Sequence, residues 1–492
     1  MKRYWYSCLA TFVMLSFNSC STNPVTGKKE VILVSKEQEN AMGQQSDPEI
    51  INYFGVYQDA KLQQFINEKG KAMGAISHRP ELNYTFKVVD SPVINAFAVP
   101  GGYVYFTRGI MAHFNNEAEF AGVLGHEIGH VTARHSAQQQ SKAMLAQIGM
   151  VVGMVVAPEL GQFAQAAQQG VGLLFLKFGR DDERESDRLG VEYSTRIGYD
   201  ATEMAKFFTT LERQSSKSDG EKVPNFLSTH PAPAERLETV GQYAAEWKQK
   251  TGATNLKVNR DQYLRLIDGI ILGEDPKQGF VENNVFYHPV MKFQFPIPAG
   301  WQVQNTPQMV QMAPQGGKAM MMMTLAQGTN VQAAAQQIAQ QYSLQVRESK
   351  EVSVNGLPAL AMVADQQPQQ QGQGQQTQGQ QTASVRALIY LIQYGGNIYN
   401  MMGVSTLQDF NSYANVFTAS MQNFKQLTDQ SKLNRQPERV RIKTVPQTGT
   451  LSQVLRSFQM PDKRLEELAL LNGMALTDQV TKGSLIKVVD TQ

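Results

Sequence analysis

The sequence His126-Glu127-Ile128-Gly129-His130 constrains this chain more than any other feature. Residues four apart share one face of an α-helix, so the two histidines can direct their imidazole nitrogens at a single metal ion. Glu127 then lies one position round the helix and can reach a water bound to that ion. These groups are the minimum set for zinc-assisted hydrolysis of a peptide bond.

The residues around this motif predict a helix independently of it, and we expect the segment from Ala121 to Ser136 to be helical throughout. Asn116 and Glu119 form an Asn-x-x-Glu start signal, and apolar residues recur at helical spacing from 120 to 131. An ordinary core helix is the alternative, but it is disfavoured because the chain has only 7 His. A structural zinc site is also disfavoured, because such sites prefer Cys ligands and both Cys residues lie near the start of the chain.

A catalytic zinc needs a third protein ligand and an open position. His135 is a poor candidate, since it follows His130 by about 500° of helical rotation and points away from the face of the pair. The chain also has Ala133 and Ser136 where a metzincin needs Gly and His. We therefore expect a carboxylate farther along the chain to complete the set.

The segment from Asp181 to Gly190, DDERESDRLG, is the best source of that carboxylate. Its first residues can cap a helix, which puts Glu183 in the first turn and Asp187 four residues on along the same face. We predict Glu183 as the third ligand and Asp187 as a neighbour that orients a zinc-bound imidazole. Glu185 is the alternative ligand, and a solvated helix start is the alternative without a metal.

Together, these motifs resemble the gluzincin-type metallopeptidases that include the CAAX prenyl endopeptidase, the HtpX-like membrane proteases and the periplasmic BepA-type proteases. The matching residues, within residues 22–250, are His126-Glu127-x-x-His130, Glu183-x-x-x-Asp187, Thr229-His230-Pro231 with Arg236, Asn95-Ala96-Phe97 and Pro100-Gly101-Gly102. The resemblance implies one Zn²⁺ per chain, held by the two motif histidines and Glu183, with Glu127 as the general base. His230 is then expected near the zinc, either as a latch on its open position or as a contact to the oxyanion.

The chain begins with the pattern of a secretory signal. Lys2 and Arg3 precede an apolar stretch that ends in Asn18-Ser19-Cys20. We expect residues 1–20 to be a lipoprotein signal peptide, Cys20 to carry the lipid anchor, and residues 21–36 to be a tether. An ordinary cleaved signal and an uncleaved anchor are the alternatives. The prediction places the protein in the periplasm as an outer-membrane lipoprotein.

Residues 37–250 are expected to form the peptidase domain. We predict a hairpin of Ile94–Val99 and Tyr103–Thr107 that leads towards the zinc helix. The candidate substrate-binding residues are Asn95 and the strand Tyr103, Val104, Tyr105 and Phe106. This strand is our candidate for a sheet edge that holds an extended substrate through main-chain hydrogen bonds. A purely structural hairpin is the alternative.

Two apolar segments, Met144–Ala157 and Val171–Phe178, lie between the two motif helices. Both are shorter than the ~20 residues of a membrane-spanning helix, so we predict core helices, with a segment that leans on a membrane or guards the substrate as the alternative. The chain has 45 Lys and Arg against 43 Asp and Glu, a formal net charge of +2. This balance indicates no acidic polymer as a partner, and the chain carries no nucleic-acid-binding motif.

Two further domains follow in the sequence. Residues 285–427 are predicted to be a small α+β domain that contains a Gln/Gly-rich loop at 366–381. Residues 440–490 have a strand, helix, helix, strand order with Leu-x-x-Leu-Asn-Gly at 468–473, which resembles a LysM module. That resemblance implies binding to glycans that contain N-acetylglucosamine, such as peptidoglycan.

The sequence therefore predicts an α+β chain, in which a mainly helical, zincin-like peptidase domain with a small sheet precedes the α+β domain and the βααβ module. By the resemblance, we expect a zinc endopeptidase of the cell envelope whose substrates are unfolded or misassembled envelope proteins. The alternative is a chaperone or assembly factor that holds envelope clients and in which cleavage is minor or latent.

Overall fold

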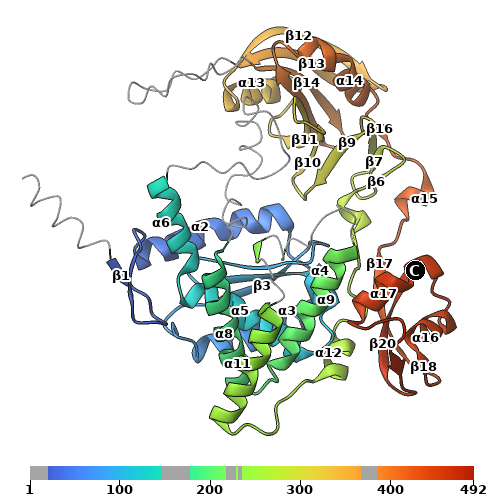
Figure 1. Ribbon diagram of the computed structural model, residues 1–492. Helices are drawn as coiled ribbons and strands as arrows, with labels where there is room; N and C mark the ends of the chain where they lie inside the picture. Colours follow the sequence, from blue (N-terminus) through green and yellow to red (C-terminus); the bar gives the residue numbers. More distant parts are fainter. Residues whose placement is uncertain are drawn as a thin grey trace, which may run out of the picture. The chain divides into compact units, whose positions relative to one another are not determined.

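The computed structural model of this 492-residue chain describes residues 20–146, 178–217, 226, 229–230, 235–366 and 385–491. These residues form two compact units (Figure 1). The first combines residues 20–146 and 178–273 with the tail from 437 onward, and the second spans residues 274–436. The predicted signal peptide, most of the two apolar segments and nearly all of the Gln-rich loop lie outside the described residues.

The first unit is mainly helical. Ahead of the tail, its helices are α2 (Lys36–Phe54), α3 (Ala60–Ala75), α4 (Arg108–His113), α5 (Glu117–Thr132), α6 (His135–Ala146), α8 (Arg180–Arg196), α9 (Thr202–Lys217), α11 (Glu235–Thr251) and α12 (Arg260–Leu266). An N-terminal hairpin of β1 (Cys20–Thr22) and β2 (Lys29–Val31) precedes them. The expected tether is therefore folded onto this unit from its first described residues, because Ile32 and Val34 pack with Ala137 of α6.

A three-stranded sheet lies beside the helices. Its strands are β3 (Thr85–Val89), β4 (Ala96–Val99) and β5 (Tyr103–Thr107), in the order β3-β5-β4. The predicted hairpin of β4 and β5 is confirmed. The prediction that Tyr103–Phe106 forms the edge is wrong, because β5 also pairs in parallel with β3, a strand that comes earlier in the chain. Among the described residues, β5 is the central strand and β3 and β4 are the two outer strands of this sheet.

Helices α5 and α8 run side by side through the centre of the unit (Figure 1). Glycines permit this close approach: a Cβ on Gly125 would lie 2.8 Å from the carbonyl oxygen of Gly190, and a Cβ on Gly190 would lie 3.0 Å from the backbone nitrogen of His126. The absence of these side chains brings the first turns of α8 up to the motif histidines.

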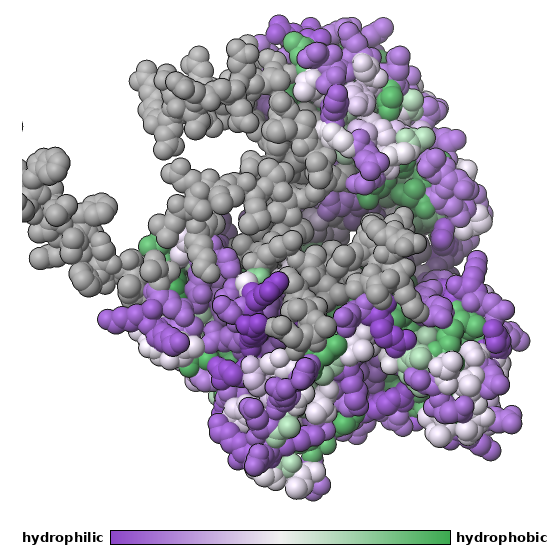
Figure 2. Space-filling model, in the orientation of Figure 1, coloured by the Kyte–Doolittle hydropathy of each residue, from purple (hydrophilic) through white to green (hydrophobic). Residues whose placement is uncertain are grey.

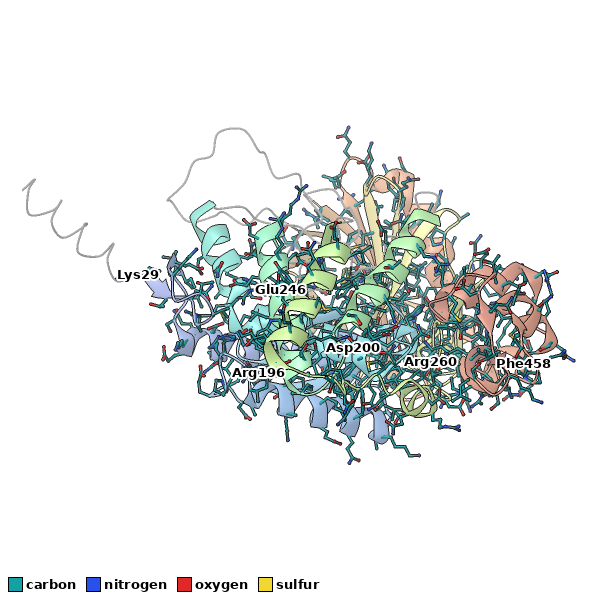
Figure 3. All side chains as sticks on the ribbon, turned by 60° about the horizontal axis from the view of Figure 1, so that its bottom comes forward. Lys29, Arg196, Asp200, Glu246, Arg260 and Phe458 are labelled. Carbon is teal, nitrogen blue, oxygen red and sulfur yellow. The ribbon has the colours of Figure 1, made fainter. Side chains whose placement is uncertain are left out.

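The tail contains β17 (Glu438–Thr444), β18 (Gly449–Thr450), α16 (Leu451–Ser457), α17 (Leu465–Leu471), β19 (Gln479–Val480) and β20 (Leu485–Thr491). Its buried residues Val440, Leu468 and Ile486 belong to the same apolar core as Phe114 and Phe120 of the peptidase segment. Arg260 of α12, labelled in Figure 3, donates to the carbonyl of Leu485 at 2.8 Å. The tail and the peptidase segment are thus one folded body.

The second unit is built on a seven-stranded antiparallel sheet in the order β12-β13-β14-β15-β11-β10-β9. Its strands are β9 (Trp301–Asn305), β10 (Met309–Pro314), β11 (Ala319–Ala326), β12 (Leu344–Val354), β13 (Leu357–Gln366), β14 (Val385–Tyr394) and β15 (Asn397–Thr406). The methionines of β11 alternate in direction: Met320 and Met322 pack with helix α13 (Val331–Gln341), whereas Met321 and Met323 pack with helix α14 (Phe410–Gln422). A second sheet, in the order β16-β8-β7-β6, contributes to the α14 side. The α+β fold class is confirmed in both units.

That second sheet consists of β6 (Phe280–Glu282), β7 (Val285–His288), β8 (Phe293–Pro296) and β16 (Lys425–Gln426).

On the face of the molecule in Figure 2, the described residues are mostly hydrophilic, with smaller hydrophobic areas among them. Among the described residues, no helix combines the length and the apolar character needed to cross a membrane.

Candidate metal centre

Helix α5 presents the two motif histidines. Asn116 caps it as predicted, since its side-chain oxygen accepts from the backbone N–H of Glu119 at 2.8 Å. His126 and His130 are completely buried, and their Nε2 atoms lie 3.0 Å apart. Two nitrogens this close need either a shared proton or a cation between them, so the protonation of each ring decides which is present.

Asp187 of α8 sets the tautomer of His126. Its Oδ1 lies 2.9 Å from His126 Nδ1, and Arg236 donates to both carboxylate oxygens at 2.6 and 2.7 Å. Burial raises the pKa of Asp187, but Arg236 and His126 outweigh it and hold that pKa below its usual value. An ionised carboxylate only accepts, so His126 Nδ1 carries the proton and Nε2 presents a lone pair to the centre.

His135 sets the tautomer of His130, which the sequence did not predict. Helix α5 ends at Thr132 and Arg134 takes a φ of 62°, so the expected helix to Ser136 is interrupted and His135 turns back. Its Nδ1 lies 2.9 Å from His130 Nδ1, and its Nε2 lies 3.2 Å from Glu185 Oε2. Because Glu185 accepts the His135 Nε2 proton, His135 Nδ1 accepts from His130, whose Nε2 is left with a lone pair.

Glu185, the alternative ligand, therefore supports a histidine instead. Glu183 occupies the centre, with Oε1 at 3.5 Å from His130 Nε2 and Oε2 at 3.6 Å from His126 Nε2. Arg236 also forms an ion pair with Glu183, with 2.8 Å between its Nη1 and Glu183 Oε2. Burial raises the pKa of Glu183, but His230 and His126 outweigh it, so the net pKa is lowered.

His230 supplies a fourth side chain that can act as a metal ligand. Its Nδ1 lies 3.3 Å from His126 Nε2 and 3.0 Å from Glu183 Oε1. Ligands about 2.0–2.1 Å from one zinc ion in tetrahedral geometry are about 3.3 Å from each other. Five separations among these groups, counted to either oxygen of Glu183, lie between 3.0 and 3.6 Å and are close to that value, and the two facing imidazole lone pairs need a cation between them. Among the described residues, His126, His130, Glu183 and His230 are thus positioned to bind one metal ion.

Glu127 lies next to this set without belonging to it. Its Oε1 is buried, has no hydrogen-bond partner among the described residues and is 3.7 Å from His230 Nε2. Burial raises the pKa of Glu127. His230 and His126 lower it by less, so the net pKa is above its usual value. A carboxylate with a free oxygen and a raised pKa beside a metal centre is suited to accept a proton from water.

Two aromatic rings enclose His230, and neither was predicted. Phe226 stacks on it with ring centroids 4.7 Å apart, and Phe178 stacks on both His230 at 5.6 Å and His130 at 4.1 Å. Phe226 is fully buried, whereas Phe178 is half-buried. The only sequence signal for these residues was their place just before the Glu183 and His230 motifs.

The side chains of the predicted substrate-binding strand make contacts within the first unit. Val104 and Phe106 are fully buried in the main core, and Tyr105 donates through its hydroxyl to Asp47 at 2.7 Å. Tyr103 is partly exposed on the strand that β3 and β4 flank. Asn95 precedes the edge strand β4, and its side-chain oxygen is buried with no partner in the part of the chain that the structure describes. The side chain of Cys20 lies outside the described residues.

An HExxH helix whose Glu can act as the base, together with a glutamate from a second helix, defines the class of zinc metallopeptidases. Within that class, residues 58–244 match the model of peptidase family M48.

Several curated relatives match the same region. The putative beta-barrel assembly-enhancing protease of Vibrio cholerae is 33% identical over 200 residues, which are 39% of this chain and 41% of the relative. The beta-barrel assembly-enhancing protease of Escherichia coli is 30% identical over 230 residues, which are 45% of this chain and 46% of the relative. The mitochondrial metalloendopeptidase OMA1 of Arabidopsis thaliana is 32% identical over 188 residues, which are 38% of this chain and 37% of the relative. The chain thus spans less than half the length of these relatives.

Among solved structures, a protein from Bacteroides thetaiotaomicron covers 43% of this chain and 88% of its own length, with a TM-score of 0.23 and 11% identity. The cyanobacterial PsbP of Synechocystis covers 29% of this chain and 91% of its own length, with a TM-score of 0.22 and 6% identity.

Proposed function

We propose that this protein is a zinc-dependent endopeptidase of the cell envelope, and that it cleaves unfolded or misassembled envelope proteins. The observation that carries the proposal is the convergence of buried His126, His130, Glu183 and His230, whose ligand atoms all lie within 4.8 Å of one another, with the buried Oε1 of Glu127 beside His230. The names of the bacterial relatives, beta-barrel assembly-enhancing proteases, support the choice of substrate class.

The chemistry divides among the residues. His126, His130 and Glu183 would hold the zinc, which supplies a Lewis acid that acidifies a water and polarises the scissile carbonyl. Glu127 accepts the proton of the attacking water and returns it to the leaving nitrogen. Arg236 balances the negative charge of Glu183 and Asp187, so that both carboxylates stay ionised in a buried site.

The test compares the full chain with Glu127→Gln for zinc content and for cleavage of casein. We expect about one zinc per chain in both proteins, and a loss of cleavage by a factor of at least about 10³ in the variant, because only the proton acceptor is removed. A parent protein without zinc contradicts the metal assignment, and a Glu127→Gln variant that still cleaves contradicts the role of Glu127.

A second function, the holding of clients with cleavage minor or latent, is favoured by one observation: His230 closes the fourth position around the centre. Suppression of the aggregation of an unfolded outer-membrane protein by Glu127→Gln separates the two functions. Holding survives this substitution, whereas a purely proteolytic role does not.

Localisation and further partners are part of the same proposal. The apolar stretch that ends in Asn18-Ser19-Cys20 supports an outer-membrane lipoprotein in the periplasm, acylated at Cys20. The order of elements from β17 to β20 supports a LysM-like tail that binds peptidoglycan. Labelling with a fatty-acid analogue, compared between the parent and Cys20→Ser, and sedimentation with insoluble peptidoglycan test these two points.

A further inference from the structure

Three charged side chains are buried together where α5 ends. Glu39 comes from α2, Arg79 from the segment between α3 and β3, and Arg134 from the turn between α5 and α6, and each is 1% exposed. Arg79 Nη1 donates to the two oxygens of Glu39 at 3.1 and 3.3 Å, and Arg134 Nε donates to Glu39 Oε2 at 2.9 Å. The carboxylate of Glu81 balances the charge, at 3.4 Å from Arg79 Nε. Because removal of one member leaves a buried charge unpaired, this cluster holds three separate segments together.

Arg79 also helps to end the helix that carries the motif histidines. Its Nη1 donates to the carbonyl of Val131, the residue after His130, at 3.3 Å. If the helix continued, that carbonyl would accept from the backbone N–H of His135. It accepts instead from the backbone N–H of Arg134 at 3.2 Å and from Arg79. A cation at the last carbonyls of a helix stabilises its C-terminal end.

Arg134 has a backbone conformation that residues of its type rarely adopt. Its φ of 62° lies in the left-handed region, where glycine is the usual residue at the end of a helix because it has no Cβ. The side chain of Arg134 offsets this strain through its bond to Glu39 and through Nη2, which donates to the carbonyl of Val34 at 2.8 Å. A strained residue that its surroundings hold so firmly indicates that the conformation itself is needed.

The turn at Arg134 decides where His135 points. Helix α6 begins at His135, whose Nδ1 lies 2.9 Å from His130 Nδ1. In an uninterrupted helix, His135 would follow His130 by about 500° of rotation and would face away from the motif histidines. The contact between the two rings, and with it the tautomer of His130, therefore depends on this turn.

We propose that Glu39, Arg79 and Arg134 form a positioning cluster of the metal centre, which keeps Arg134 in its left-handed turn so that His135 reaches His130 and sets its tautomer. This inference rests on the proposed zinc site. The cluster acts on the metal through His135. Partners that orient a ligand in this way change metal affinity by about 10- to 100-fold.

The test compares Arg134→Ala with Arg134→Gly in the full chain. Both substitutions remove the guanidinium from Glu39, but only glycine adopts the left-handed turn without strain. Zinc affinity is measured by competition with a chromophoric chelator. We expect it to fall by about 10- to 100-fold in Arg134→Ala and to stay within about threefold of the parent in Arg134→Gly. Gln459→Ala is the matched control: Gln459 also has a φ of 62°, but it follows α16 in the tail, so zinc affinity should not change.

The outcomes separate the inference from a merely structural role. Equal losses in Arg134→Ala and Arg134→Gly mean that the guanidinium does not act through the turn. Parent affinity in Arg134→Ala means that the turn does not orient His130. Either result overturns the inference while the zinc site stands, whereas a parent protein that binds no zinc overturns the proposed function.

A second comparison repeats Arg134→Ala in His135→Phe. If the cluster acts through His135, the substitution costs less than about twofold in zinc affinity in that background, because the partner has already been removed. An equal loss in both backgrounds overturns the inference.

Arg79→Met takes the place of Arg134→Ala if circular dichroism shows that the latter does not fold. It leaves Arg134 and Glu39 as a balanced pair but removes one donor from the carbonyl of Val131. We expect a loss of zinc affinity of about fivefold, the value of one hydrogen bond, and of less than about twofold in His135→Phe. Unchanged affinity in Arg79→Met overturns the inference.

Discussion

The latch role proposed for His230 can be tested at this one residue. Its Nδ1 completes a set of four donors, and Phe178 and Phe226 stack against its ring. If this closed form holds about nine-tenths of the molecules, His230→Ala raises kcat/KM for casein by about tenfold. The double variant with Glu127→Gln should be inactive, which ties the gain to this site. A loss of activity with zinc retained means that His230 contacts the reacting carbonyl instead.

His113 makes the stability of the first unit depend on pH. Burial lowers the pKa of this histidine to about 4, against a hydrogen bond to the carbonyl of Gly109 that raises it. Since the unfolded value is about 6.5, the unfolded chain binds the extra proton first as the pH falls. The contribution of neutral His113 to the free energy of unfolding is present in full above pH ~6.5. By about pH 4 it is lost, and the free energy of unfolding falls by about 3 kcal/mol.

The measurement is urea unfolding of the zinc-free protein at pH 7 and pH 4 for the parent and for His113→Gln. Glutamine stays neutral at both values, so the variant should lose about 3 kcal/mol less than the parent. The comparison cancels the titration of all other groups, and equal losses in the two proteins contradict the assignment.

At the scale of elements, local patterns predicted where α5 begins but not where it ends. Asn116 and Glu119 lie within one turn of each other, so the start signal is local. The end depends on Arg134, which is held by Glu39 of α2 at 2.9 Å and by the carbonyl of Val34. Those partners are about a hundred residues away in sequence, so a local pattern could not reveal the break or the return of His135 to His130.

The same limit explains the error about β5. Its alternation and its hairpin with β4 are local, whereas its parallel partner β3 comes from a separate segment. Glu183, Asp187 and His230 could be predicted because the motifs that carry them are distinctive in type and order. The supporting roles of His135 and Glu185 could not, because they depend on the way α6 and α8 meet.

The position of β4 as an outer strand of the three-stranded sheet, as far as the described residues show, gives a prediction. The N–H of Thr107 donates to the carbonyl of Asn95 at 3.0 Å, so in the alternating antiparallel pattern the backbone groups of Ala96 and Ala98 face away from β5. Ala98→Pro removes one outward donor and is tolerated at an edge. We expect KM for a peptide substrate to rise about fivefold, the value of one hydrogen bond, with zinc content unchanged.

Ala98→Val is the matched control, since it adds side-chain volume at the same position but keeps the N–H. A KM that rises equally in both variants indicates a steric effect, and a KM that rises in neither means that substrates do not pair with β4.

At the scale of the whole molecule, chain order and folded units differ. The sequence predicts three consecutive domains, whereas the tail folds with the peptidase segment and the second unit is inserted between them. Lys487 of β20 shows how closely the tail is joined: its buried ammonium donates to the carbonyls of Ala112 and Phe114 at 2.8 and 2.7 Å. Burial lowers the pKa of Lys487 to about 7, which is tolerable only where such acceptors surround it.

The ends of the insertion are adjacent, and this predicts that the second unit can be removed. Leu272 donates to the carbonyl of Glu438 at 2.8 Å, and Val440 donates to that of Ile270 at 2.9 Å, so a short Gly/Ser linker can replace residues 274–436. We expect the shortened protein to bind one zinc and to keep the melting temperature of the first unit within a few degrees. Truncation after Gln436 is the comparison, because it removes the tail's share of the core and should destabilise the peptidase segment by more than about 4 kcal/mol. If calorimetry and zinc titration show that the protein truncated after Gln436 is the more stable of the two, the tail is not part of the peptidase fold.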